Sequence, residues 1–167
     1  MSKRDKLARG GVYIHPLLAN GKRPEVFIFF SMRTQRLYKE AFKELTGRET
    51  NFTEAIRTAA KMATKNHMID LPDEELIAII RAASMGQTNE ELSLEDIDNS
   101  IIDQVDRTRI YAALIASLPA IREGLKPKDW KALNEAKDPE AVIKDFFTTT
   151  LRENLKALGS ALMKSGD

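Results

Sequence analysis

Residues 25–66 read EVFIFFSMRTQRLYKEAFKELTGRETNFTEAIRTAAKMATKN. The apolar run at residues 26–30 is β-branched and aromatic and is too short for a helix, so it predicts a strand. Beyond it the apolar residues recur with a helical period, and Gly47 marks the end of that helix. Asn51 and Glu54 have the spacing of a capping box at the start of a second helix. The stretch therefore predicts a strand followed by two helices.

The segment before this stretch is basic and polar. We expect residues 1–24 to form a basic arm with a possible edge strand at residues 12–18, and residues 1–11 to be mobile or ordered only on a partner. Asn20-Gly21 is a turn signal, so the two strands would form a hairpin. Gly10-Gly11 lacks the rest of a phosphate-binding loop and is interpreted as a hinge.

The rest of the chain is predicted to be helical. Pro72 followed by three carboxylates is typical of a helix start, and Gly86 would end that helix. A dense helical pattern returns near residue 101 and is interrupted at Pro119. We therefore expect a mostly α protein with a small N-terminal β element. Its predicted parts are the arm at 1–24, a strand-helix-helix-helix unit at 25–86, an acidic linker at 87–100 and a helical C-terminal domain at 101–167.

Charge is unevenly distributed along the chain. Residues 1–66 carry 14 Lys and Arg against 6 Asp and Glu, whereas residues 67–106 carry 1 against 11. The remaining residues carry 11 against 8, so the net charge of +1 conceals a dipolar chain. Such asymmetry is typical of proteins that bind a polyanion or that pair oppositely charged surfaces, although both segments could also be solvated faces.

The sequence offers no catalytic constellation. There are no cysteines, which excludes disulfides and thiolate chemistry and is compatible with a reducing compartment. His15 and His67 lack partners at metal-ligand spacing. No run approaches the length of a membrane span, and the N-terminus lacks a signal-peptide core. We therefore expect a cytoplasmic protein that is not an enzyme, with no cofactor, no metal and no membrane partner.

The run from Phe27 to Arg33, the helix that Gly47 ends and the helix that opens at Asn51 together resemble the ribbon-helix-helix family of DNA-binding proteins. The resemblance covers about 40 of the 167 residues. It implies that two chains pair their strands into a ribbon that enters the major groove, and that the second helix binds a phosphate at its N-terminus. It further implies a core-facing set of Ile28, Phe30 and Met32, a DNA-facing set of Phe29, Ser31 and Arg33, and a phosphate site near Thr50, Asn51 and Phe52.

These observations lead to two functional hypotheses. The first is a nucleic-acid-binding protein, with DNA favoured over RNA, whose helical C-terminal half mediates oligomerisation or partner binding. Its phosphate contacts would come from the basic N-terminal third, namely Lys3, Arg4, Lys6, Arg9, Lys22, Arg23, Arg33 and Arg36. The alternative is a structural or adaptor subunit of a larger assembly, such as a ribonucleoprotein, phage or plasmid complex, in which acidic and basic faces of neighbouring subunits meet.

Overall fold

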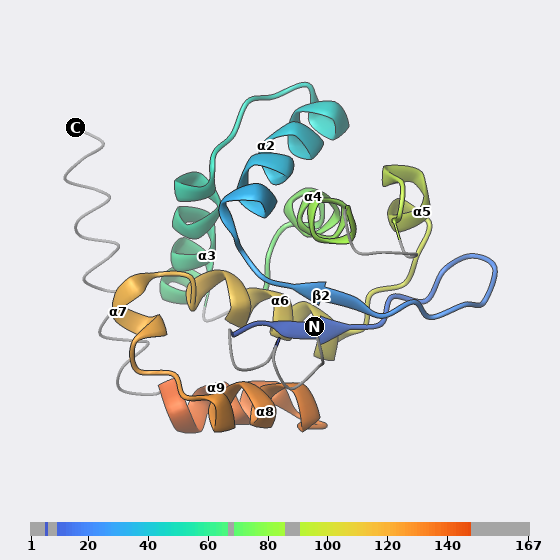
Figure 1. Cartoon of the computed structure of the whole chain (residues 1–167). Coiled ribbons are helices and arrows are strands. Elements are labelled where there is room, and N and C mark those ends of the chain that lie inside the picture. The colour runs from blue at the N-terminus through green and yellow to red at the C-terminus, as the bar shows by residue number, and fades with distance from the viewer. Residues whose placement is uncertain (1–5, 7–9, 67–68, 86–90, 148–167) are drawn as a thin grey trace, which may run out of the picture.

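The computed structural model describes residues 6, 10–66, 69–85 and 91–147, and these form a mostly helical fold with a small N-terminal hairpin, as predicted (Figure 1). The expected helix end at Gly86 and the apolar pattern beyond residue 147 lie outside the described residues. The elements are β1 (Val12–Ile14), β2 (Val26–Ile28), α2 (Met32–Thr46), α3 (Phe52–Asn66), α4 (Asp73–Ser84), α5 (Leu94–Asp98), α6 (Gln104–Ile115), α7 (Pro119–Arg122), α8 (Pro127–Glu135) and α9 (Pro139–Phe147).

The hairpin lies at the centre of the fold. β1 and β2 are antiparallel, with Val12 opposite Ile28 and Ile14 opposite Val26. These four side chains are fully buried, and the strands pack on α6 and α4. Figure 1 shows the hairpin between α2 and α4 on one side and α8 and α9 on the other. The hairpin therefore joins the two halves of the chain.

The predicted strand at residues 26–30 is shorter in the structure. It ends at Ile28 because Val12, the partner of Ile28, is the first residue of β1. Gly10 and Gly11, with φ values of 91° and 136°, precede Val12 in conformations that a strand does not use. Phe29 and Phe30 therefore connect β2 to α2 without pairing to β1.

α2 has clear start and stop signals. The Ser31 hydroxyl accepts a hydrogen bond from the backbone N–H of Thr34 at 3.1 Å, which caps the N-terminus. Gly47 has a φ of 76° and its N–H bonds to the Lys43 carbonyl at 2.7 Å, as in a left-handed C-cap. The predicted end at Gly47 is confirmed. The buried side of α2 consists of Leu37, Tyr38, Ala41 and Phe42 and packs on α4.

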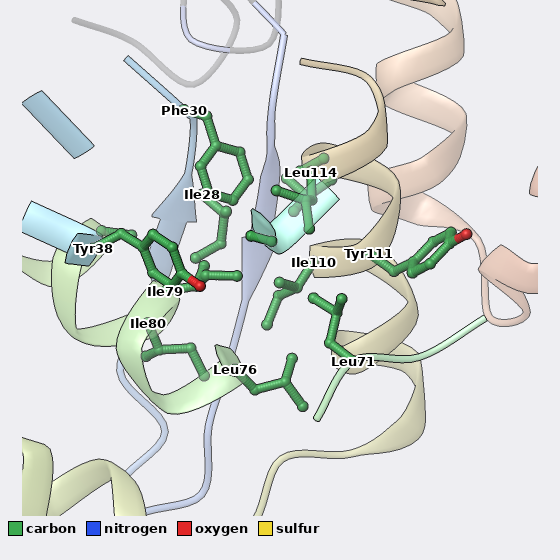
Figure 2. Close-up of a cluster of buried hydrophobic side chains, with 14 of the residues drawn as sticks. Ile28, Phe30, Tyr38, Leu71, Leu76, Ile79, Ile80, Ile110, Tyr111 and Leu114 are labelled. Atoms are coloured by element: carbon green, nitrogen blue, oxygen red, sulfur yellow. The ribbon is translucent and has the colours of Figure 1, made fainter. Parts of the chain in front are cut away.

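One cluster of buried apolar side chains extends from β1 to α9. Figure 2 shows Tyr38 of α2 and Ile79 of α4 on one side of Ile28, with Ile110 and Leu114 of α6 on the other. Side chains that come before and after residues 87–100 in the sequence therefore belong to the same core. Within the described part of that segment, Leu92 and Ile97 are also buried in it.

Candidate nucleic-acid interface

The exposed side of α2 carries a group of basic side chains. Arg33, Arg36, Lys39 and Lys43 recur every three or four residues, so they lie on one side of the helix, opposite its buried residues. All four side chains are exposed. We call these four residues the basic face of α2. Glu40 and Glu44 are also exposed on this helix, which leaves a net positive charge there.

Most of the basic face is not neutralised within the protein. Lys43 Nζ lies 2.6 Å from Glu49 Oε1, and this hydrogen bond raises the pKa of Lys43. Arg33, Arg36 and Lys39 form no salt bridge with any residue in the described part of the chain. Their charges are therefore available to an anionic partner.

Met32 corrects one implication of the ribbon-helix-helix resemblance, which places this residue in the core. Met32 is the first residue of α2, and its side chain is 88% exposed beside the basic face. The period of side-chain directions changes from two to 3.6 where the helix begins, so alternation along the strand cannot extend to residue 32. Ile28 and Phe30 are buried, as the resemblance implies.

Phe29 and Ser31 already have contacts within the chain. The Ser31 hydroxyl caps α2. The Phe29 ring is partly buried and stacks on Phe27, with ring centroids 6.3 Å apart. The Arg122 guanidinium of α7 lies 5.5 Å from the Phe29 centroid. Of the DNA-facing set that the resemblance implies, Arg33 alone lies on the basic face of α2.

The predicted phosphate residues of α3 lie at its N-terminus. The Asn51 side-chain oxygen accepts a hydrogen bond from the Glu54 N–H at 2.9 Å, so Asn51 acts as a helix cap. Thr50 is partly buried and close to the Tyr38 hydroxyl. Asn51 already satisfies one N–H donor of the first turn of α3, which leaves fewer donors for a phosphate.

The other basic residues predicted to contact phosphate lie away from the basic face of α2 or outside the described residues. Lys22 and Arg23 are at the hairpin tip, which Figure 1 shows well separated from α2. Arg23 Nη1 lies 3.3 Å from Asp103 Oδ2 and also donates to the His15 carbonyl. Lys6 Nζ lies 5.6 Å from the Phe27 ring centroid. Lys3, Arg4 and Arg9 lie outside the described residues. The structure thus brings Arg33 and Arg36 together on one surface and places Lys22 and Arg23 on another.

Two ion pairs join the basic segment, residues 1–66, to the acidic segment, residues 67–106. Arg23 and Asp103 join the basic segment to the acidic one, and so do Arg48 and Glu74, whose closest atoms are 2.7 Å apart. Within the acidic segment and its flank, Arg107 binds both Asp70 and Asp73, with closest distances of 3.1 Å and 2.8 Å. Of the basic face of α2, Lys43 pairs with Glu49, whereas Arg33, Arg36 and Lys39 have no salt bridge to the residues that the structure describes.

Two members of the basic face, Lys39 and Lys43, were not among the phosphate contacts expected from the sequence. The signal that identifies them is their spacing from Arg36 on the predicted helix, at i+3 and i+7. The total charge of the segment does not contain this signal, because it does not depend on which side of the helix each residue occupies.

The described residues include no group of three or more His, Asp or Glu side chains arranged to hold a metal ion. No helix among them is long and apolar enough to cross a membrane. His15 Nε2 lies 3.0 Å from Glu25 Oε2, whereas His67 lies outside the described residues.

No protein-family model, curated protein or solved structure matches the chain.

Proposed function

We propose that this protein binds nucleic acid, with DNA favoured over RNA, through the basic face of α2. The observation that carries the proposal is that Arg33, Arg36 and Lys39 are exposed on one side of α2 without a salt-bridge partner in the described chain. The residues from 33 to 43 span about 15 Å along the helix axis. A DNA duplex carries several phosphates over that length, so the basic face can neutralise more than one of them.

The chemistry of these side chains supports phosphate binding. Arginine offers a planar fork of N–H donors that matches two phosphate oxygens, and lysine adds a flexible point charge. Such contacts supply affinity without reading sequence. Because β2 pairs with β1 of the same chain, the proposal rests on α2 and not on a ribbon shared by two chains. In this proposal the helical C-terminal half mediates oligomerisation or partner binding.

A salt titration of binding to labelled duplex DNA tests the proposal. The logarithm of the binding constant should fall linearly with the logarithm of salt concentration, with a slope of about −3 to −4 for three or four phosphate contacts. The triple variant Arg33→Ala, Arg36→Ala, Lys39→Ala should lower the magnitude of this slope by about 3 and weaken binding at least tenfold, a rough expectation for phosphate contacts.

A matched control separates a local interface from net charge. Lys128, Lys131 and Lys137 are exposed in or just after α8, and changing all three to alanine alters the net charge by the same amount. This control should bind like the wild type. Equal losses in both triple variants, or no loss in the α2 variant, would contradict the proposal. Single-stranded RNA of similar length should bind more weakly than the duplex.

Absence of nucleic-acid binding would favour the alternative function, a structural or adaptor subunit of a larger assembly. If neither nucleic acid binds at low salt, and sedimentation shows self-association that weakens as salt rises, the basic face would be a docking surface in a larger assembly. Sedimentation of the free protein also tests the oligomerisation assigned to the C-terminal half.

A further inference from the structure

Three consecutive carboxylates begin α4, and the third differs from the other two. Asp73 and Glu74 are exposed and pair with Arg107 and Arg48, respectively. Glu75 is only 7% exposed and turns toward the interior. Negative charge at a helix N-terminus is favourable when solvated, but it is costly when buried without a cation. Stabilisation of the helix dipole therefore does not explain why Glu75 is buried at the start of α4.

Glu75 lies where α2, α3 and α4 meet. Its neighbours are the fully buried Tyr38 of α2 and Thr58 of α3, whose hydroxyl is within hydrogen-bonding reach of the carboxyl group. The Thr58 hydroxyl donates its hydrogen to the Glu54 carbonyl at 3.0 Å. Its oxygen can therefore accept a hydrogen bond from a protonated Glu75. The Glu75 Oε2 atom has no hydrogen-bond partner among the residues that the structure describes.

No cation compensates this carboxyl group among the described residues. The charged groups that act on it are the carboxylates of Glu74, on its own helix, and Glu54, on α3. Arg57 of α3 is directed to Glu54, with closest atoms 2.9 Å apart. β2 has no titratable side chain, and none on α5 is among the groups that act on Glu75, although both elements pack on α4. Burial is the largest cause that raises the pKa of Glu75; the hydrogen bond with Thr58 opposes it, the charges of Glu74 and Glu54 add to it, and the net result is a pKa of about 7.

We propose that the protonation state of Glu75 controls how tightly the start of α4 packs against α2 and α3. The neutral carboxylic acid fits this apolar junction and can donate to Thr58. The carboxylate has neither a counter-charge nor a full set of donors there, so ionisation favours states in which the junction opens and water reaches Glu75. This inference does not depend on nucleic-acid binding.

The direction of the pH effect follows from the two pKa values. The pKa of Glu75 in the closed junction is about 7, above the ordinary value of 4.5 that applies when the junction is open. Stabilisation by the neutral acid is therefore complete below about pH 4.5 and is lost as the pH rises to about 7. Above that pH the closed and open forms are both ionised, and the effect levels off.

Amide hydrogen exchange, corrected for the intrinsic pH dependence, measures this opening. Protection of the hydrogen-bonded amides in the second turns of α3 and α4 should fall roughly tenfold or more between pH 5 and pH 7 in the wild type, because opening is linked to one ionisation. In the variant Glu75→Gln, which cannot ionise, protection of the same amides should stay nearly constant. The variant Glu44→Gln removes an exposed carboxylate of α2 that is not among the groups acting on Glu75, and it should behave like the wild type.

A direct titration of the Glu75 carboxyl carbon by NMR completes the test and requires only the wild type. A titration midpoint near neutral pH supports the proposal, and a midpoint near the ordinary glutamate value overturns it. The proposal also fails if Glu75→Gln shows the same pH-dependent loss of protection as the wild type.

Discussion

Replacing Asp106 by alanine should lower the free energy of unfolding by about 3 kcal/mol, as expected when one partner of a buried polar network is removed. Asp106 is in the first turn of α6 and is only 5% exposed. Its Oδ2 atom accepts a hydrogen bond from the His15 N–H, 3.0 Å away, just after β1. Its Oδ1 atom lies 3.6 Å from Nη1 of Arg109, which also donates to the carbonyls of Leu133 and Ala136.

The lower free energy of unfolding is expected because Asp106 and Arg109 connect three elements, β1, α6 and α8. Without Asp106, the His15 N–H at the end of β1 loses its acceptor, and the buried Arg109 loses its counter-charge. Arg109 also connects α6 to the end of α8, so the hairpin, α6 and α8 are linked through one pair of side chains. Denaturant unfolding measures the change, provided that the slope of the transition stays constant.

Asp106→Asn is the matched control. The amide keeps the size of the side chain and an oxygen that can accept from the His15 N–H. Burial raises the pKa of Asp106, an effect that the His15 hydrogen bond and Arg109 oppose, so removing the negative charge has a small net cost. We expect Asp106→Asn to lie within about 1 kcal/mol of the wild type. Equal losses in the alanine and asparagine variants would contradict this expectation, because they would show that the negative charge beside Arg109, and not the hydrogen bond to the His15 N–H, accounts for the effect.

Local signals in the sequence predicted most of the secondary structure. The short apolar run around Phe27, the turn at Gly21, the helix stop at Gly47 and the cap at Asn51 each act within a few residues, and each has the expected role in the structure. Pro119, expected to interrupt a helix, lies between the end of α6 and α7 and is the first residue of α7. Such signals are readable because they depend on neighbours along the chain.

Long-range contacts are not readable in this way. Asp106 and Glu75 look like ordinary helix-start carboxylates, and their burial depends on segments distant in sequence. The 91-residue separation between His15 and Asp106 gives no local pattern. For the same reason, the basic region can be recognised in the sequence, whereas the ion pairs that neutralise part of it, such as Arg48 with Glu74, cannot. The candidate interface was therefore predicted in part, through Arg33 and Arg36.

The interpretation of Gly10-Gly11 as a hinge was also incomplete, because the structure shows both glycines in close contact with aromatic side chains. A Cβ atom built on Gly10 would lie 3.1 Å from the Trp130 indole of α8. One built on Gly11 would lie 2.5 Å from Phe27 Cζ and 2.7 Å from the Ile28 carbonyl oxygen. Glycine at residue 11 thus allows the backbone to approach β2 closely, in a conformation that other residues rarely adopt.

Gly11→Ala should therefore lower the free energy of unfolding by about 3 kcal/mol, of which roughly 1 kcal/mol is backbone strain and the rest is steric overlap. Gly21→Ala separates the two terms. Gly21 at the hairpin tip also has a positive φ, 84° against 136° for Gly11, but a Cβ atom there would meet nothing within 4 Å. We expect Gly21→Ala to cost about 1 kcal/mol in the same denaturant experiment. If the two variants lost equal stability, the contact with Phe27 and Ile28 would have to relax without cost, and the close approach of this segment to β2 would not be what requires glycine at residue 11.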